Sequence, residues 1–185
     1  MKQGKVIILG GNARSGKTTL AIMLSKKNYS RISFDTLTTA IEEGLGINLD
    51  DKPEEILFKF FEIIVNNSIE DAKNYGVNTV IDMYDFLPEQ VSRLKNQKDI
   101  SVYFLAYPGF SKEEIKYNVK HYAKPTDWIA QVTDEYLDEC AERFYLRNSL
   151  LQKECEKYNC NFIDTSAGED RGKILNSLFE EILHN

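Results

Sequence analysis

Residues 5–22 read KVIILGGNARSGKTTLAI, and this stretch decides the fold. The unbroken apolar run Val6–Leu9 is typical of a strand buried on both faces, and the glycines behind it end that strand. A polar loop follows, and from Thr18 onward the pattern indicates a helix. Between the strand and the helix, Gly11–Thr18 matches G-x-x-x-x-G-K-[ST], a pattern that requires this structural context. The stretch therefore predicts a loop that binds phosphate.

Each residue type in this loop suits a triphosphate and its metal ion. Glycines let successive backbone N–H groups, with a helix N-terminus behind them, point at one anion. Lys17 adds a mobile positive charge for the β- and γ-phosphates, and the Thr18 hydroxyl is a ligand for Mg²⁺. The residues predicted to bind the nucleotide here are Gly11, Asn12, Ala13, Arg14, Ser15, Gly16, Lys17, Thr18 and Thr19. The alternative is a glycine-rich strand-to-helix turn that carries a solvated lysine.

Length and composition limit the class of protein. A chain of 185 residues, 42% of them hydrophobic, suits one packed domain over residues 1–185. The net charge of −6 disfavours DNA or RNA as a partner. The three cysteines form no redox or zinc motif, and the N-terminal apolar segment is too short for a signal peptide or a membrane span. We therefore expect a cytoplasmic protein with no nucleic-acid or membrane partner; the sequence does not indicate its oligomeric state.

Strand and helix patterns alternate along the whole chain. The expected strands are 6–9, 29–34, 77–83, 100–107 and 161–165. The expected helices are 18–27, 36–43, 53–76, 88–96, 111–121, 133–158 and 171–183. Such alternation implies right-handed crossovers and a parallel sheet covered by helices on both faces, which is a three-layer α/β sandwich.

Two aspartates follow predicted strands. Asp82 ends the apolar strand 77–81, the position from which an aspartate holds Mg²⁺ through water; the alternative is an ordinary turn residue at a strand end. Asp35 follows the second strand and reaches the same edge of the sheet as the phosphate loop. There its carboxylate can accept the proton of an attacking hydroxyl, or it can cap the helix that begins at Thr36.

The segments GNARSGKTT, SFDTL, VIDMYDF and DTSAG, in this order and spacing, resemble the small P-loop kinases of the nucleoside-monophosphate and shikimate kinase type. The resemblance covers nearly the whole chain and implies a P-loop NTPase fold with strand order 2-3-1-4-5. It also implies ATP and Mg²⁺ as cofactors, a small-molecule acceptor bound after strand two, and a donor base backed by Ser166, Ala167 and Gly168. Thr38 and Met83 stand where nucleotide-accepting members tend to carry arginine, which disfavours a nucleoside monophosphate as the acceptor.

The resemblance further implies a mobile helical lid after strand four, here at about residues 108–147. A lid supplies cations over the transferred phosphoryl group. Two sets are spaced for one helix face: Lys112, Lys116 and Lys120, and the favoured pair Arg143 and Arg147. Ordinary solvated helix faces are the alternative for both sets. The predicted catalytic residues are Lys17, Asp35, Arg143 and Arg147.

The leading hypothesis is a kinase that moves the γ-phosphoryl group of Mg-ATP to a small acceptor bearing a hydroxyl or a phosphate. A GTPase-like switch is disfavoured because the nearest string, Asn96–Asp99, is a scrambled form of the guanine-binding motif and precedes the fourth strand instead of following a strand. An ATPase or a nucleotide-binding scaffold that acts on a protein partner stays open. A polynucleotide kinase is disfavoured by the acidic charge.

Overall fold

The structure is a computed structural model and describes residues 3–49, 51–84, 86–123, 129, 132–166 and 170–184. The strands are β1 (Val6–Gly11), β2 (Tyr29–Ser33), β3 (Asn78–Asp82), β4 (Ser101–Ala106) and β5 (Asn161–Asp164). The helices are α1 (Lys17–Ser25), α2 (Phe34–Leu45), α3 (Glu54–Tyr75), α4 (Pro88–Ser92), the 3-10 helix η1 (Gln97–Asp99), α5 (Lys112–His121), α6 (Asp134–Tyr158) and α7 (Arg171–His184).

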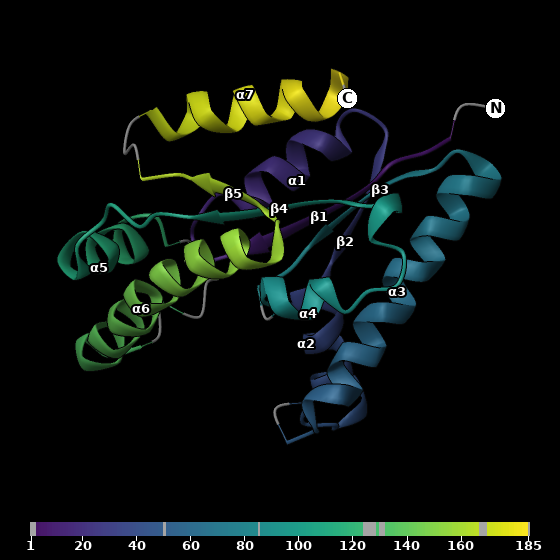
Figure 1. The fold of residues 1–185 in the computed structure, drawn as a ribbon. Coiled ribbons are helices and arrows are strands. Elements are labelled where there is room, and N and C mark those ends of the chain that lie inside the picture. The colour runs from purple at the N-terminus through teal and green to yellow at the C-terminus, as the bar shows by residue number, and fades with distance from the viewer. Residues whose placement is uncertain are drawn as a thin grey trace.

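The five strands form one parallel sheet in the order β2-β3-β1-β4-β5 (Figure 1). β1 lies at the centre, with Ile8 in register with Ile81 of β3 and with Val102 of β4. The predicted fold class and strand order are therefore confirmed. Because every strand runs the same way, the loops after β1, β2, β3 and β4 open at one edge of the sheet.

Helices cover both faces of the sheet, and β1 shows why. Its side chains alternate, so that Val6 and Ile8 pack into a core beneath α3, α4 and α6, whereas Ile7 and Leu9 pack into a second core beneath α1 and α7. Figure 1 shows α1 and α7 on one side of the sheet and α3, α4 and α6 on the other. The result is the three-layer sandwich that the continuous apolar run predicts.

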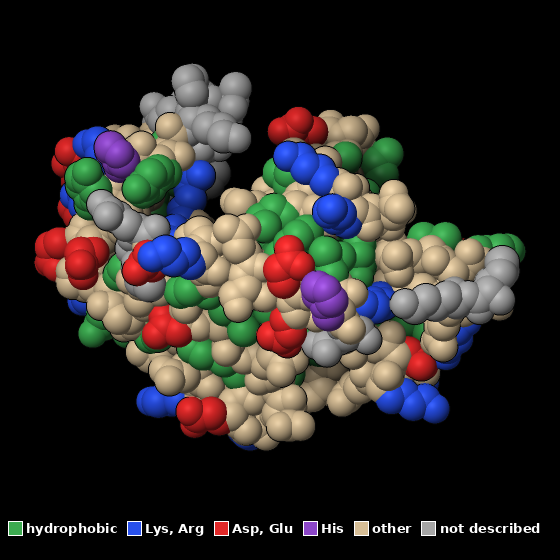
Figure 2. All heavy atoms as spheres, turned by 90° about the horizontal axis from the view of Figure 1, so that it is seen from above, with side chains coloured by type: hydrophobic (Ala, Val, Ile, Leu, Met, Phe, Trp, Pro, Cys, Tyr) green, Lys and Arg blue, Asp and Glu red, His purple; other side chains and the backbone are tan. Residues whose placement is uncertain are grey.

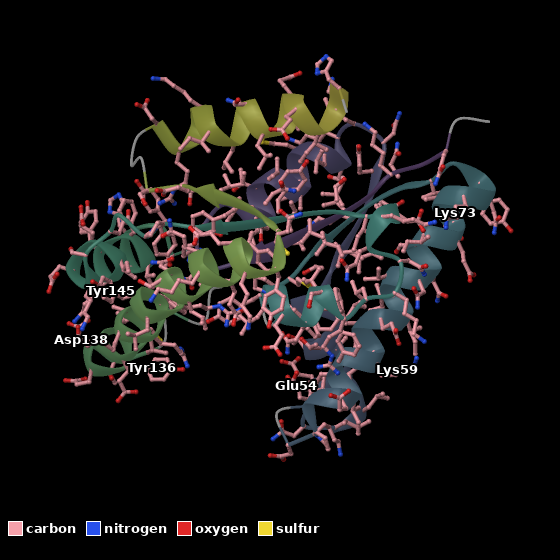
Figure 3. All side chains as sticks on the ribbon, viewed as in Figure 1. Glu54, Lys59, Lys73, Tyr136, Asp138 and Tyr145 are labelled. Carbon is pink, nitrogen blue, oxygen red and sulfur yellow. The ribbon has the colours of Figure 1, made fainter. Side chains whose placement is uncertain are left out.

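A third apolar cluster holds α5 against the N-terminal half of α6. It is built from Tyr107, Phe110, Ile115, Val119, Ile129, Leu137, Cys140, Ala141 and Phe144. Three ion pairs cross the same interface in antiparallel register: Lys112–Glu142, Lys116–Asp138 and Lys120–Asp134. Figure 3 labels Asp138 on the part of α6 that lies beside α5. The lysine stripe therefore faces α6 and is paired with carboxylates there, which favours the arginines over the lysines as the cations of the site.

Several helix boundaries differ from the prediction by a few residues, and the start of α2 and the end of α4 have a clear physical reason. Helix α2 begins at Phe34, because the buried Phe34 ring packs against Phe61 and Phe86, and Ser33 is the N-cap whose Oγ accepts from Thr36 N at 3.4 Å. Asp35 consequently lies in the first turn and is not the cap. Helix α4 ends at Ser92 rather than at residue 96. The next residue, Arg93, lies over the Phe58 ring of α3, with 4.1 Å between Arg93 Cζ and the ring centroid.

Two predicted helix starts are confirmed by their caps. Ser111 Oγ accepts from Glu114 N at 3.2 Å, while Ser111 N donates to Glu114 Oε2 at 2.8 Å, which closes a capping box at the start of α5. Thr133 Oγ1 accepts from Tyr136 N at 3.3 Å at the start of α6.

The molecular surface carries mixed charge. On the face shown in Figure 2, Lys and Arg side chains are interspersed with Asp and Glu, with no broad field of one sign. Among the helices that the structure describes, none is both long enough and apolar enough to cross a bilayer.

Candidate active site

A large cavity of about 1280 Å³ lies where the β1, β2 and β3 loops open. Its wall includes Ala13–Thr19, Asp35, Tyr84, Arg143 and Arg147. Segments that are more than a hundred residues apart in the sequence thus meet around one space. Of the predicted site residues, Gly11, Asn12, Asp82 and Ser166 lie outside this wall, and Ala167 and Gly168 lie outside the described residues.

Two glycines shape the phosphate loop. Gly11 has φ +123°, and a Cβ at that position would lie 2.1 Å from Leu105 O of the neighbouring strand. Gly16 has φ +103° and precedes α1, where a Cβ would lie 2.9 Å from the Leu175 side chain. Both backbones are in a region that side-chain-bearing residues rarely adopt, so glycine is required at each. The loop therefore turns sharply and aims the N-terminus of α1 into the cavity.

Lys17 is folded over this loop. Its side chain is largely buried, with the residue only 7% exposed, and its Nζ donates to Asn12 O at 2.7 Å. It is thus not the solvated lysine of a plain strand-to-helix turn. Ser15 Oγ is buried in the cavity wall and has no hydrogen-bond partner among the described residues. A buried hydroxyl of this kind is costly unless a ligand satisfies it, and phosphate oxygens in the cradle fit this requirement.

The Asn12 side chain points away from the cavity. Its Nδ2 donates to Phe144 O at 2.7 Å and to Asn148 Oδ1 at 2.9 Å, both on α6. Its Oδ1 accepts from Ala13 N at 3.0 Å. Asn12 was predicted to bind the nucleotide; the structure instead places its amide in a contact between the loop and α6.

The two predicted carboxylates lie near each other but in different surroundings. Asp82 is buried and pairs with Arg31 of β2, whose Nη2 is 2.9 Å from Asp82 Oδ2. Asp35 opens onto the cavity, and desolvation by the surrounding protein raises the pKa of its carboxyl. The charge of Asp82 adds to this rise, whereas Lys17, the Tyr84 backbone N–H and Arg31 oppose it. A carboxylate with a raised pKa is a better proton acceptor than an ordinary aspartate.

Both predicted arginines of α6 line the cavity. Arg147 stacks on the Tyr84 ring, with 4.4 Å between Cζ and the ring centroid, and donates to Tyr84 O. Its Nε is buried without a partner among the described residues, which leaves a donor for a ligand oxygen. Arg143 is exposed at the cavity wall, and its Nη2 lies 3.3 Å from Cys140 Sγ.

Two further residues belong to the site, and one of them, Arg171, was missed by sequence reasoning. Arg171, the first residue of α7, donates from Nη1 to Arg14 O at 3.0 Å and from Nε to Thr165 O at 3.3 Å. Burial lowers the pKa of this guanidinium, although it stays charged. Tyr84, two residues after Asp82, forms part of the wall beside Lys17. An arginine at a helix start carries no distinctive pattern, so the sequence offers no signal for Arg171.

The loop after β5 lies next to the turn after β4. Ser166 Oγ accepts from Gly109 N at 2.8 Å, and Ser166 N donates to Asp164 Oδ1 at 2.8 Å. These bonds connect Ser166 to the protein rather than to the cavity, so its role in backing a donor base stays a prediction.

The described residues contain no group of three His, Cys, Asp or Glu side chains able to hold a metal ion by themselves. Mg²⁺ usually keeps several waters and binds one or two protein groups together with substrate phosphates, so a site for this ion does not require such a group. The hydroxyl of Thr18 in the cavity wall and the carboxylate of Asp82 at the end of β3 are of the required oxygen chemistry.

No protein-family model matches the chain, and no curated protein matches it in sequence. Solved structures do match. A shikimate kinase from Bacteroides thetaiotaomicron is similar with a TM-score of 0.59 and 18% identity, covering 98% of this chain and 99% of that one. A shikimate kinase from Acinetobacter baumannii is similar with a TM-score of 0.53 and 18% identity, covering 100% of this chain and 96% of that one. A gluconokinase from Sinorhizobium meliloti is similar with a TM-score of 0.55 and 13% identity, covering 99% of this chain and 97% of that one. The chain therefore has the fold of the P-loop kinases of the shikimate and adenylate kinase type.

Proposed function

We propose that this protein is a phosphotransferase that moves the γ-phosphoryl group of Mg-ATP to a small acceptor bearing a hydroxyl or a phosphate. The observation that carries the proposal is the composition of the cavity wall. A glycine-shaped phosphate loop, a carboxylate with a raised pKa and two arginines from a distant helix face one space. Phosphoryl transfer needs positioning, a proton acceptor and positive charge around the moving group, and this wall offers all three.

On the donor side, the loop N–H groups, Lys17 and the Ser15 hydroxyl would hold the phosphates of ATP. Thr18 and Asp82 would hold Mg²⁺, which when bound neutralises charge on the phosphates. The Asp82–Arg31 pair, at 2.9 Å, keeps this carboxylate fixed at the end of β3. Arg143 and Arg147 would add positive charge on the opposite side of the transferred group, and Arg147 Nε has no partner among the residues that the structure describes.

On the acceptor side, the wall formed by α2 presents Asp35, Thr38 and Thr39. Asp35 would accept the proton of the acceptor hydroxyl as that oxygen attacks phosphorus. In this proposal the chain is one domain, the unit formed by α5 and the N-terminal half of α6 acts as a lid, and the enzyme works in the cytoplasm.

The test is an acceptor screen coupled to ADP formation, followed by Asp35→Asn assayed with whichever acceptor is active. Asparagine keeps the size and hydrogen-bonding capacity of the side chain but removes the basic site. We expect Mg-ATP affinity to stay within about threefold while transfer falls by about a hundredfold or more. The matched control is Asp71→Asn, which makes the same change on the exposed face of α3.

Two results would count against the proposal. Wild-type turnover in Asp35→Asn would remove the proton-acceptor role from that residue. If no acceptor in the screen accelerates ADP formation, the result would favour the alternative, an ATPase or a scaffold that acts on a protein partner.

A further inference from the structure

A buried polar network joins the phosphate loop to α6. Its members are Asn12 of the loop, Tyr107 after β4 and Asn148 of α6, which are 0%, 2% and 1% exposed. Tyr107 also belongs to the third apolar cluster, but all three side chains carry polar groups that must be satisfied when buried. The three contact one another through the hydrogen bonds described next.

Asn12 uses all of its polar atoms within this network. Its Nδ2 donates to Phe144 O and to Asn148 Oδ1 of α6, and its Oδ1 accepts from Ala13 N. Its backbone N donates to Leu105 O at 2.9 Å, and its backbone O accepts from Lys17 Nζ at 2.7 Å. One residue therefore contacts the sheet, the catalytic lysine and α6 at the same time.

Asn148 and Tyr107 complete the connection. Asn148 Oδ1 accepts from Tyr107 N at 3.1 Å, and its Nδ2 donates to Tyr107 O at 3.2 Å, so that the amide pairs with both backbone groups at the end of β4. The Tyr107 hydroxyl then donates to Ala13 O at 2.7 Å. The first half of the phosphate loop is thus fixed to α6 on one side and to β4 on the other.

The anchor points alternate with the cavity arginines along α6. Arg143 is followed by Phe144, whose carbonyl is bound by Asn12, and Arg147 is followed by Asn148. A step of one residue turns a helix by about 100°. The contacts at Phe144 and Asn148 therefore fix both the rotation of α6 and its position along its axis at the level of the two arginines.

We propose that Asn12 and Asn148 are positioning residues that hold the α6 arginines in register with Lys17 over the nucleotide phosphates. The inference rests on the proposed function, because it assumes that the cavity binds a nucleotide. It goes beyond that function in assigning the register to one buried amide pair. Neither asparagine touches the ligand in this role, and each acts through the groups that do.

The test is a double-mutant cycle on affinity for Mg²⁺ and the ATP analogue AMP-PNP, measured by calorimetry. Arg147→Ala should weaken binding by about tenfold in the wild-type background, as expected for a charge-assisted contact. In the Asn148→Ala background, Arg147→Ala should weaken the affinity for Mg²⁺ and AMP-PNP by less than about twofold, because the misplaced arginine no longer contributes to binding. Equal losses in both backgrounds would overturn the proposal, since a purely structural asparagine leaves the arginine effect intact.

The matched control is another asparagine pair, Asn66 and Asn96, joined at 3.2 Å away from the cavity. In Asn66→Ala the full effect of Arg147→Ala should persist. If Asn148→Ala does not fold, Asn12→Ala removes both contacts to α6 while the Asn148–Tyr107 bonds stay, and the same cycle applies.

A hydrogen-exchange measurement needs no nucleotide and so separates this inference from the proposed function. Loss of Asn148 removes one of the two bonds that hold the Asn12 amide on α6, and the Oδ1 of the same amide accepts from Ala13 N. Asn148→Ala should therefore speed exchange at the Ala13 amide by about tenfold or more, although Ala13 does not contact the mutated side chain. Unchanged exchange at Ala13 would contradict the coupling. Absence of AMP-PNP binding together with faster exchange would overturn the proposed function alone.

Discussion

At the scale of single residues, burial determines how the phosphate loop holds its lysine. Lys17 donates to Asn12 O, so the loop satisfies its own cation before a ligand binds. A bound triphosphate would exchange this neutral carbonyl for phosphate oxygens, which form stronger, charge-assisted hydrogen bonds. The lysine is therefore held close to its expected ligand rather than spread through solvent.

Lys17→Met keeps the aliphatic stem and removes the charge. We expect Mg-AMP-PNP affinity to fall by at least about tenfold, because one charge-assisted bond to phosphate is lost. Calorimetry measures the affinity, and circular dichroism checks that the fold is retained. The control is Lys27→Met, at an exposed position just beyond α1, which should bind like the wild type. Full affinity in a folded Lys17→Met protein would contradict the phosphate-binding role of the loop.

The cysteines allow a second residue-scale prediction. Burial raises the pKa of the Cys155 thiol to about 12, from an ordinary value of 9.0. Because only the thiolate reacts with alkylating agents, the folded protein at pH 8 holds about one Cys155 in ten thousand in the reactive form. Mass spectrometry after iodoacetamide treatment should find Cys155 unlabelled in the native protein and labelled in guanidinium chloride. Rapid native labelling would show that α6 opens at this position.

The residues that sequence reasoning found are those whose role is encoded locally. Gly11, Gly16 and Lys17 are separated by fixed spacings that one loop imposes, so a pattern of eight residues identifies them. Asn148 and Arg171 depend on contacts between distant segments. An asparagine within a polar helix gives no sign that its partner lies 136 residues earlier. Such residues become visible only in the folded chain.

At the scale of helices and strands, periodicity predicts the elements and capping chemistry predicts their starts. The capping box at Ser111 and the cap at Thr133 were read correctly, because the bonds they make are local. The start of α2 and the end of α4 were not predicted correctly. Phe34 packs against Phe61 in the core, and Arg93 lies over the Phe58 ring of α3. Tertiary contacts decided those two boundaries over local preference.

The α5–α6 ion pairs give the element-scale prediction. Lys116→Glu places a negative charge opposite Asp138, and the double change with Asp138→Lys restores an ion pair with reversed charges. We expect a small drop in thermal stability for Lys116→Glu, recovery in the double variant, and near-disappearance of the difference in 1 M NaCl, because exposed pairs are weak and screened. Differential scanning calorimetry measures all three. A drop that salt leaves unchanged would point to lost packing instead of lost charge pairing.

At the scale of the whole molecule, the parallel topology assembles the cavity. Right-handed crossovers bring the carboxyl ends of β1, β2 and β3 to one edge, which is why Lys17, Asp35 and Tyr84 meet there. The alternation of strands and helices predicts this edge, because the carboxyl ends of parallel strands lie at the same edge of a sheet; the order of the strands was implied by the family resemblance. The contacts that fix α6 against the phosphate loop could not be predicted, since they come from the third apolar cluster and from the buried asparagine pair.

The last prediction concerns movement of that helical unit. α5 and the N-terminal half of α6 share an apolar cluster that is separate from both sheet cores, so they can move together. α6 is anchored to the phosphate loop at Phe144 and Asn148, so we expect the motion to occur N-terminal to that anchor. Hydrogen exchange with and without Mg-AMP-PNP should show increased protection over 112–121 and 134–143 on binding, with residues 149–158 and helix α3 unchanged as internal controls. Equal protection with and without nucleotide would remove the lid from the mechanism. A change that extends evenly along all of α6 would instead show that the whole helix moves and that the asparagine contact does not act as its fixed point.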